Sequence, residues 1–330
     1  MKRRIIKQGH NTLTITLPSK WTKRLNLTPG GEVELTEKDS GLFITSDKNS
    51  VVKKTEIDIS GLDVPSIWKY IMGVYREGYD EVRVKFDPKE QLGSPYKFFS
   101  EHKLDLKYGR EAEKKSTLEF FHELVNRFVG YEIFEHGTDY LVIREISEPT
   151  TKEFDNSLRR VFLLTQQMAE ETSEALKTNN PEVLKHIHDV DTNLDKFHDY
   201  CIRILNKLGN METGKINLYF ATLFFLELIG DEYKNISLHL LYDFKNPDFK
   251  GILGVSESIR EQFELYYKLF YNFKKEGVMQ ISALDQERYF SVGKVYTKVK
   301  SAEVTEIYHH LRLITRYLNV LTELRIQMEF

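Results

Sequence analysis

Four carboxylates with matched spacing form the first pattern in this sequence that indicates chemistry. Asp191 and Asp195 lie four residues apart, and Glu227 and Asp231 repeat that spacing further along the chain. Carboxylates at i and i+4 project from the same face of a helix, so two facing pairs would supply the oxygen ligands of one hard cation. The pattern therefore predicts a metal site, with a solvated or lysine-paired acidic stripe as the alternative.

Glu227 is the most informative of the four because the sequence around it is almost entirely apolar. It lies within LYFATLFFLELIG (218–230), a stretch too short to span a bilayer. An unpaired carboxylate buried there would cost several kcal/mol. We therefore expect Glu227 to contact a metal ion, a base or water.

A second pattern is the concentration of positive charge at the N-terminus. The 330-residue chain has a net charge of −3, yet its first 24 residues hold seven of the 47 Lys and Arg residues and none of the 50 acidic ones. This asymmetry favours a polyanionic partner. The alternative is a solvated basic edge strand that resists aggregation, which would need fewer bases.

We expect this basic end to bind double-stranded DNA. Lys and Arg, with threonine hydroxyls beside them, can bind phosphate oxygens, and Gln, His and Asn at a turn tip marked by Gly9 can reach base edges. The candidate DNA-binding residues are Lys2, Arg3, Arg4, Lys7, Gln8, His10, Asn11, Thr12, Thr14, Lys20, Lys23 and Arg24.

The elements that must position the basic residues are short and β-rich, over residues 1–50. Alternation of Thr with Leu or Ile predicts a strand over residues 12–17 with its three aliphatic side chains buried. Pro18 ends that strand, Ser19 is the expected cap of a short helix, and EVELTE and LFITS form a hairpin turned at Asp39-Ser40-Gly41. A module this small buries too little apolar area alone, so we expect a homodimer.

Residues 51–150 alternate between strand and helix patterns. Strands are predicted over KTEIDIS and EVRVKF, a hairpin over GYEIFEHGTDYLVIREI, and helices over VPSIWKYIMGVYREG and residues 114–129. This order predicts a small α/β connecting domain, with one sheet covered by two helices. No chemistry-bearing motif lies here, so the expected role is connection or dimerisation.

Residues 151–330 are almost entirely helical in pattern. Asn180-Pro181 predicts the start of a helix whose apolar residues repeat at alternating spacings of four and three, as in the seam of a helical bundle. The other helices are predicted over residues 153–178, 215–243, 256–275, 282–299 and 302–328. Two successive three-helix units indicate an internal duplication. The predicted fold class is therefore multidomain α+β.

The N-terminal sequence RIIKQGHNTLTITLPSKWTKRLNLTPGGEVEL resembles the AbrB/MazE/SpoVT family of swapped-hairpin DNA-binding domains. The shared features are Lys-x-Gly, an alternating strand that closes on Pro18, a short basic helix, and Leu25, Leu27 and Gly30 before a Val-containing strand. The resemblance implies that two chains interlock their hairpins into one β-barrel and present a two-fold basic surface to DNA. Gly9 and Pro18 stand further apart here than is usual in the family.

The helical half resembles the PhoU family over about residues 153–328. LELIGDEYKNI is close to the signature Leu-Glu-Arg-Ile-Gly-Asp-x-x-x-Asn-Ile, with Leu228 for the usual Arg, and the Asp191 pair resembles the companion acidic motif. The resemblance implies a six-helix bundle of two repeats that binds a divalent or ferric ion and restrains phosphate uptake. In the second repeat Thr315 and Asn319 replace the carboxylates, so at most one such metal site per chain is expected.

Several classes of function are disfavoured. The sequence contains no Gly-rich phosphate loop, nucleophile elbow or zinc-type Cys/His spacing, so we expect no enzyme. Asp195-x-x-His198 and Glu306-x-x-His309 have the spacing of di-iron helices, but that chemistry also needs bridging carboxylates on two other helices. The single Cys201 fits a reducing compartment, and no segment predicts membrane insertion.

Together the modules predict a cytoplasmic, homodimeric transcriptional regulator of phosphate uptake, similar to archaeal-type PhoU regulators. It would bind a pseudo-palindromic operator and sense metal, phosphate status or a transporter component. The alternative is a PhoU-type adaptor that restrains the ATPase of a phosphate ABC transporter without binding DNA, its N-terminal barrel serving only for dimerisation. An antitoxin is disfavoured because antitoxins carry short disordered tails after the barrel.

Overall fold

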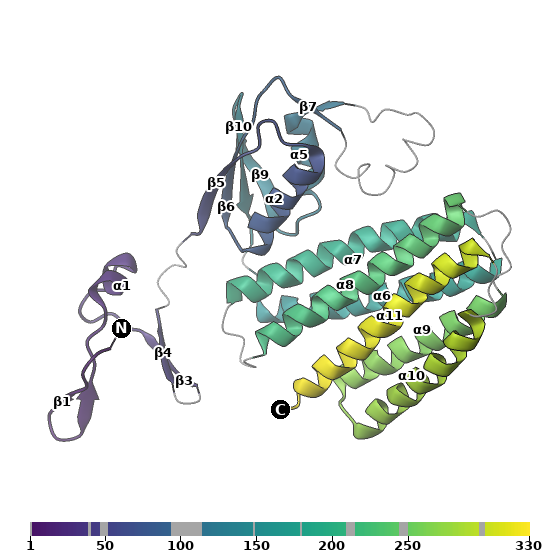
Figure 1. Cartoon of the computed structure of the whole chain (residues 1–330). Coiled ribbons are helices and arrows are strands. Elements are labelled where there is room, and N and C mark those ends of the chain that lie inside the picture. Colours follow the sequence, from purple (N-terminus) through teal and green to yellow (C-terminus); the bar gives the residue numbers. More distant parts are fainter. Residues whose placement is uncertain are drawn as a thin grey trace. The chain divides into compact units, whose positions relative to one another are not determined.

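The chain is a multidomain α+β protein in which a small β-rich module precedes a larger, mostly helical unit. The computed structural model describes residues 2–38, 41–46, 52–93, 114–147, 149–178, 180–208, 215–243, 250–296 and 301–330. Internal contacts divide the chain into two units, Met1–Lys54 and Thr55–Phe330. Short strands and one short helix make up the first unit, whereas long helices dominate the second (Figure 1).

The N-terminal module consists of two hairpins and one short helix. Strands β1 (Ile6–Gln8) and β2 (Thr12–Thr14) pair antiparallel around Gly9, whose φ of +71° lies in the left-handed region that glycine adopts without strain. Helix α1 (Ser19–Arg24) follows, and β3 (Glu34–Lys38) pairs with β4 (Gly41–Thr45). The first two residues of the predicted turn at Asp39–Gly41 lie outside the described residues.

Two expectations for this module were wrong in detail. The strand predicted over residues 12–17 ends at Thr14, because its antiparallel partner β1 begins at Ile6, which pairs with Thr14. Ser19 does not cap α1; the N-cap residue is Pro18, which has an extended backbone and no side-chain capping bond. The two hairpins are separate two-stranded sheets within one chain, so the interlocked barrel stays a prediction for two chains.

The second unit begins with a small α/β domain that contains the predicted sheet and two helices. Its sheet has the strand order β5-β6-β10-β9, built from β5 (Lys54–Asp58), β6 (Glu81–Lys85), β9 (Tyr131–His136) and β10 (Tyr140–Glu145). Helices α2 (Val64–Arg76) and α5 (Thr117–Val125) and the short pair β7 (Gln91–Leu92) and β8 (Lys115–Ser116) complete the domain.

Helix α5 is shorter than the predicted helix over residues 114–129. Ser116 accepts a hydrogen bond from the backbone N–H of Glu119, and the Glu119 carboxylate accepts one from the backbone N–H of Ser116. This capping box satisfies backbone donors at the N-terminus and so fixes the first helical residue at Thr117.

The rest of the second unit consists of long helices, shown in teal to yellow in Figure 1. These are α6 (Thr151–Thr178), α7 (Pro181–Leu208), α8 (Ile216–Leu238) with the π-helical turn η1 (His239–Asp243), α9 (Lys250–Tyr271), α10 (Lys275–Tyr296) and α11 (Ala302–Gln327). Helices α6, α7 and α8 pack on one another, α9 packs on α10 and α11, and α8–α11 and α6–α9 contacts join the two sets.

The predicted starts of α9 and α10, at residues 256 and 282, were wrong, since both helices begin several residues earlier. Gly251 and Gly254 indicated a loop in the sequence. Yet Ile252 and Ile259 are fully buried, and this packing outweighs the low helix propensity of glycine.

Helix α7 provides much of the bundle core. Ile187, Leu194, Cys201 and Ile204 from the predicted seam have no exposed surface. Within the described residues, no helix is both long and apolar enough to cross a membrane.

Candidate functional site

The four predicted metal ligands lie on the packed helices α7 and α8, but no three of them bring their ligand atoms within 4.8 Å of one another. Asp191 and Asp195 come from α7, and Glu227 and Asp231 come from α8. Burial, and then the charges of Asp195 and Asp231, raise the pKa of Asp191 well above its usual range. Burial, with the same two carboxylates, raises the pKa of Glu227 to about 8. The four residues therefore form one acidic cluster, which we call the α7–α8 carboxylate cluster.

Lys234 is one of the cations that contact this cluster in the structure. Its Nζ donates hydrogen bonds to Asp191 Oδ2, at 2.9 Å, and to Asp231. The other oxygen of Asp191 is buried without a hydrogen-bond partner in the described part of the chain. Carboxylate oxygens are the ligands that hard cations prefer, but these four would have to move closer together to share one ion. These contacts agree with the lysine-paired alternative, although the sequence did not name Lys234, which follows Asp231 by one helical turn.

The half-buried residue His188 lies near Lys234 at the edge of the cluster. His188 Nε2 lies 3.1 Å from Ser237 Oγ, which joins α7 to the end of α8. Burial and the nearby charge of Lys234 lower the pKa of His188 to about 4. His188 is therefore neutral near pH 7 and adds no charge to the cluster.

The acidic row on α7 continues to Asp199, which sequence reasoning also missed. Asp199 is fully buried, and Arg76 Nε on α2 donates to its Oδ1 at 2.7 Å. Arg127 Nη2 lies 3.2 Å from both Asp195 Oδ2 and Asp199 Oδ2. Burial alone would raise the pKa of Asp199, but His198, Arg127 and Arg76 together lower it to about 2. The signal was present in the sequence, because Asp199 extends the four-residue spacing of Asp191 and Asp195.

Two arginines of the α/β domain therefore contact the carboxylate row of the bundle. Arg127 follows α5, and Arg76 ends α2. Since Arg127 shares Asp195 with the α7–α8 carboxylate cluster, a change in that cluster can alter a contact between the two parts of the second unit.

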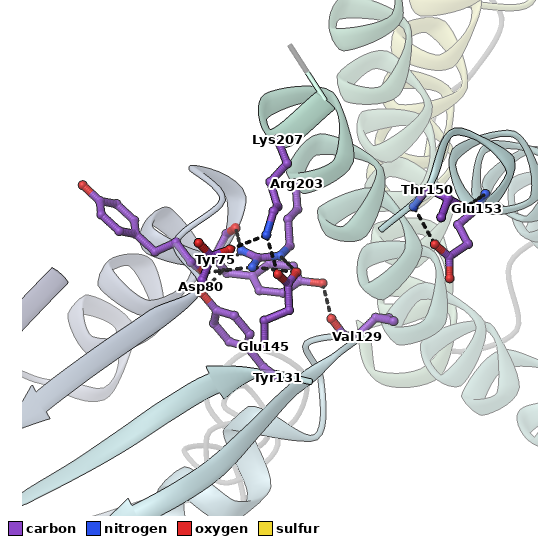
Figure 2. Close-up of polar contacts among 10 residues, drawn as sticks. Tyr75, Asp80, Val129, Tyr131, Glu145, Thr150, Glu153, Arg203 and Lys207 are labelled. Atoms are coloured by element: carbon purple, nitrogen blue, oxygen red, sulfur yellow. Dashed lines mark hydrogen bonds and ion pairs between the residues drawn. The ribbon is translucent and has the colours of Figure 1, made fainter. Parts of the chain in front are cut away.

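A second set of polar contacts between the bundle and the α/β domain lies one to two turns further along α7. Figure 2 shows Arg203 and Lys207 reaching from α7 towards Glu145, Asp80 and the tyrosines of the α/β domain. Arg203 is fully buried; its Nη2 donates to Glu145 Oε1 at 2.9 Å, and its Nη1 donates to the carbonyl oxygen of Tyr75 at 2.7 Å. Lys207 contacts both Asp80 and Glu145.

Aromatic rings enclose the Arg203 guanidinium. Its central carbon lies 4.9 Å from the ring centroid of Tyr75 and 4.7 Å from that of Tyr131. A buried charge is costly unless it is paired and hydrogen-bonded, and here every side of the guanidinium meets a partner. The α/β domain and α7 are thus joined by specific polar contacts.

The predicted DNA-binding residues lie at the surface of the N-terminal module. All are exposed except Thr14, which is half-buried and donates its hydroxyl to the carbonyl oxygen of Ile6 at 3.2 Å. Gln8 ends strand β1, and His10 and Asn11 form the hairpin tip with Gly9. Lys20, Lys23 and Arg24 lie on α1, which contains no acid. Residues with the chemistry to contact phosphate and base edges are therefore accessible.

The same module exposes its aliphatic side chains. Leu13 is 68% exposed and Ile15 is 47% exposed, although the alternating pattern predicted their burial. Leu35, Leu42 and Phe43 of the second hairpin are also exposed. Leu35 and Leu42 share one face of the second hairpin, whereas Phe43 lies on the other, and a single chain leaves these apolar side chains without cover.

One comparison with known proteins matches the N-terminal module. The family described as "Antidote-toxin recognition MazE, bacterial antitoxin" matches residues 6–51. The chain therefore begins with a MazE-type domain, as its sequence predicted. No curated protein matched the chain. Among solved structures, PhoU from Pseudomonas aeruginosa matches with 10% identity and a TM-score of 0.48, covering 54% of this chain and 95% of that one.

Proposed function

We propose that the chain is a homodimeric DNA-binding regulator of phosphate uptake. The observation that carries this proposal is the N-terminal module, in which the exposed basic residues of the acid-free segment 1–24 accompany uncovered apolar side chains. We assign the same hairpins of a second chain as the partner that covers these side chains, because the MazE-type sequence resembles domains that dimerise by swapping hairpins. Pairing would place two basic surfaces side by side, and so favour a two-fold operator.

The link to phosphate rests on the helical half. LELIGDEYKNI resembles the PhoU signature, and its Glu227 and Asp231 belong to the α7–α8 carboxylate cluster. We assign a divalent or ferric ion to Asp191, Asp195, Glu227 and Asp231. Bound there, the ion would supply positive charge that neutralises the carboxylates. Lys234 would then lose its role as their counter-charge.

The contacts of Asp195 provide a route by which such an ion could influence the α/β domain. Asp195 belongs to the cluster and is also paired with Arg127, at 3.2 Å. If the carboxylate turns towards a cation, Arg127 retains only Asp199 as its ion-pair partner in the described residues. Ligand binding regulates a protein only when it favours one arrangement over another, and this shared carboxylate gives two arrangements.

The proposal is tested by DNA binding at two salt concentrations. A dimer presents about fourteen Lys and Arg side chains from its two N-terminal segments. If half of them contact phosphates, the affinity for DNA should fall by about 10³ to 10⁴ between 50 and 200 mM salt. Fluorescence anisotropy of the full-length protein with labelled duplexes measures this. Arg3→Ala with Arg4→Ala should weaken binding to every duplex. Asn11→Ala should mainly change sequence preference.

The matched control is Lys69→Ala with Lys89→Ala, which removes the same charge from exposed positions on the second unit. DNA affinity should be unchanged in this control. Equal losses in both double variants, or binding that ignores salt, would contradict the proposal. Absence of DNA binding together with capture of a phosphate-transporter ATPase would support the adaptor function instead.

A further inference from the structure

Three potential metal ligands converge at the end of α8, away from the carboxylates predicted from the sequence. His239 begins the π-helical turn η1, and Glu306 and His310 lie four residues apart on α11. Their ligand atoms all lie within 4.8 Å of one another. Glu306 Oε1 is 3.9 Å from Nε2 of His239 and 3.9 Å from Nε2 of His310. Among the described residues, this is the one group of three that converges so closely.

His310 is oriented as a metal-binding histidine would be. Its Nδ1 lies 2.6 Å from Glu232 Oε2, so the ring donates its Nδ1–H to that carboxylate and keeps a lone pair on Nε2. The Nε2 atom is buried and has no hydrogen-bond partner in the described residues, and the whole of His310 is only 8% exposed. An unpartnered buried acceptor is unfavourable unless something binds it. Metal-bound histidines characteristically give their second nitrogen to a carboxylate in this way.

The two helical segments meet here for a structural reason. Helix α11 packs along α8, and its residues also contact η1. The rings of His239 and His310 lie with centroids 5.2 Å apart. Single π-helical turns within α-helices are frequent at functional sites. The fold therefore brings together ligands that are about seventy residues apart in the sequence.

We propose that His239, Glu306 and His310 bind a divalent first-row transition metal such as Zn²⁺. Two imidazole nitrogens and one carboxylate oxygen are ligands that suit this class, whereas the all-oxygen α7–α8 carboxylate cluster suits harder cations. In tetrahedral zinc sites with bonds of about 2.0–2.1 Å, the ligand atoms lie about 3.3 Å apart. The ligand atoms of these three side chains therefore need to move only slightly closer together to bind the ion. Glu306 is half-exposed, which leaves the remaining coordination position open to solvent.

The test is Zn²⁺ titration of the metal-free full-length protein by calorimetry, with Co²⁺ absorption as a second measurement of coordination. The wild type should bind one ion at this site. Loss of a residue that only hydrogen-bonds to a metal ligand weakens metal binding by roughly 10- to 100-fold. Glu306→Gln and His239→Ala remove ligands themselves, so each should weaken Zn²⁺ binding by at least that much. Glu232→Gln should weaken binding by roughly 10- to 100-fold and also change the Co²⁺ spectrum, because Glu232 positions His310.

Two controls separate this site from other histidines and carboxylates. His309→Ala removes the exposed neighbouring histidine and should leave Zn²⁺ affinity unchanged. Glu227→Gln with Asp231→Asn disables the other cluster and should also leave it unchanged. Circular dichroism verifies folding, and half-exposed Glu306 provides the decisive variant if His239→Ala is unstable. Zn²⁺ affinity in Glu306→Gln equal to that of the wild type, or absence of Zn²⁺ binding, would overturn the proposal. Neither result concerns DNA binding.

Discussion

At the scale of single residues, Glu227 controls how the α7–α8 carboxylate cluster responds to pH. Its pKa in the folded chain is about 8, above its ordinary value of 4.5. The folded state therefore holds this proton more tightly than the unfolded state does. As pH rises from about 4.5 to about 8, the free energy of unfolding falls, because the unfolded chain ionises Glu227 at less cost.

Glu227→Gln should remove this dependence. The variant and the wild type should be similarly stable near about pH 5, whereas the variant should be the more stable near about pH 8.5. Chemical denaturation at both pH values measures the difference. Glu174→Gln, at an exposed carboxylate on α6, is the control and should follow the wild type. Parallel pH profiles for Glu227→Gln and the wild type would refute the assignment.

Residue spacing identified the carboxylates of the cluster but not their partners. The i, i+4 rule applies within one helix, so Asp191 with Asp195 and Glu227 with Asp231 could be paired from sequence. Arg127 reaches Asp195 across a large sequence separation, which is a property of tertiary packing. The His239 site was missed for the same reason, because its ligands come from distant segments.

At the scale of elements, the exposed face of the N-terminal hairpins argues for pairing between two chains. Changing Leu13 and Ile15 to Ser should weaken that pairing, because burying an aliphatic side chain contributes about 1.5–3 kcal/mol. Two such losses per chain should raise the dissociation constant of the dimer by at least about 100-fold. Analytical ultracentrifugation of the full-length protein measures this.

The control for this prediction is Met279→Ser, at another exposed apolar residue, on α10. It should leave the mass in solution unchanged. The far-ultraviolet circular dichroism of the hairpin variant should also stay helical, since the bundle belongs to the other unit. A dimer that persists in the hairpin variant at the same concentrations would contradict the pairing.

Elements with explicit end signals were predicted well, and those without them were not. Helix α7 begins at Pro181, where Asn180 Oδ1 accepts the backbone N–H of Glu182, as the Asn-Pro pair predicted. Helix α9 contains two glycines in its first turns, and its start depends on buried contacts that no local pattern reveals. Strand β2 was predicted too long because the alternating pattern does not show where its antiparallel partner begins.

At the scale of the whole molecule, α7 connects the candidate metal cluster to the α/β domain. Asp195 and Asp199 pair with arginines of that domain, and Arg203 and Lys207 contact its acids further along the same helix. A helix held at two places transmits a displacement as a rigid element. The role in connection or dimerisation that the sequence predicted for residues 51–150 stays a prediction.

The burial of Cys201 has a practical consequence for following this helix. It is the one cysteine of the sequence, it has no exposed surface, and burial raises the pKa of its thiol. The thiolate is the nucleophile that attacks an alkylating reagent, so buried Cys201 should react only when α7 leaves its neighbours. Mass spectrometry should therefore find iodoacetamide labelling far slower in buffer than in denaturant. Rapid labelling in buffer would show that the bundle opens readily. Slow labelling would make Cys201 a native probe of that opening.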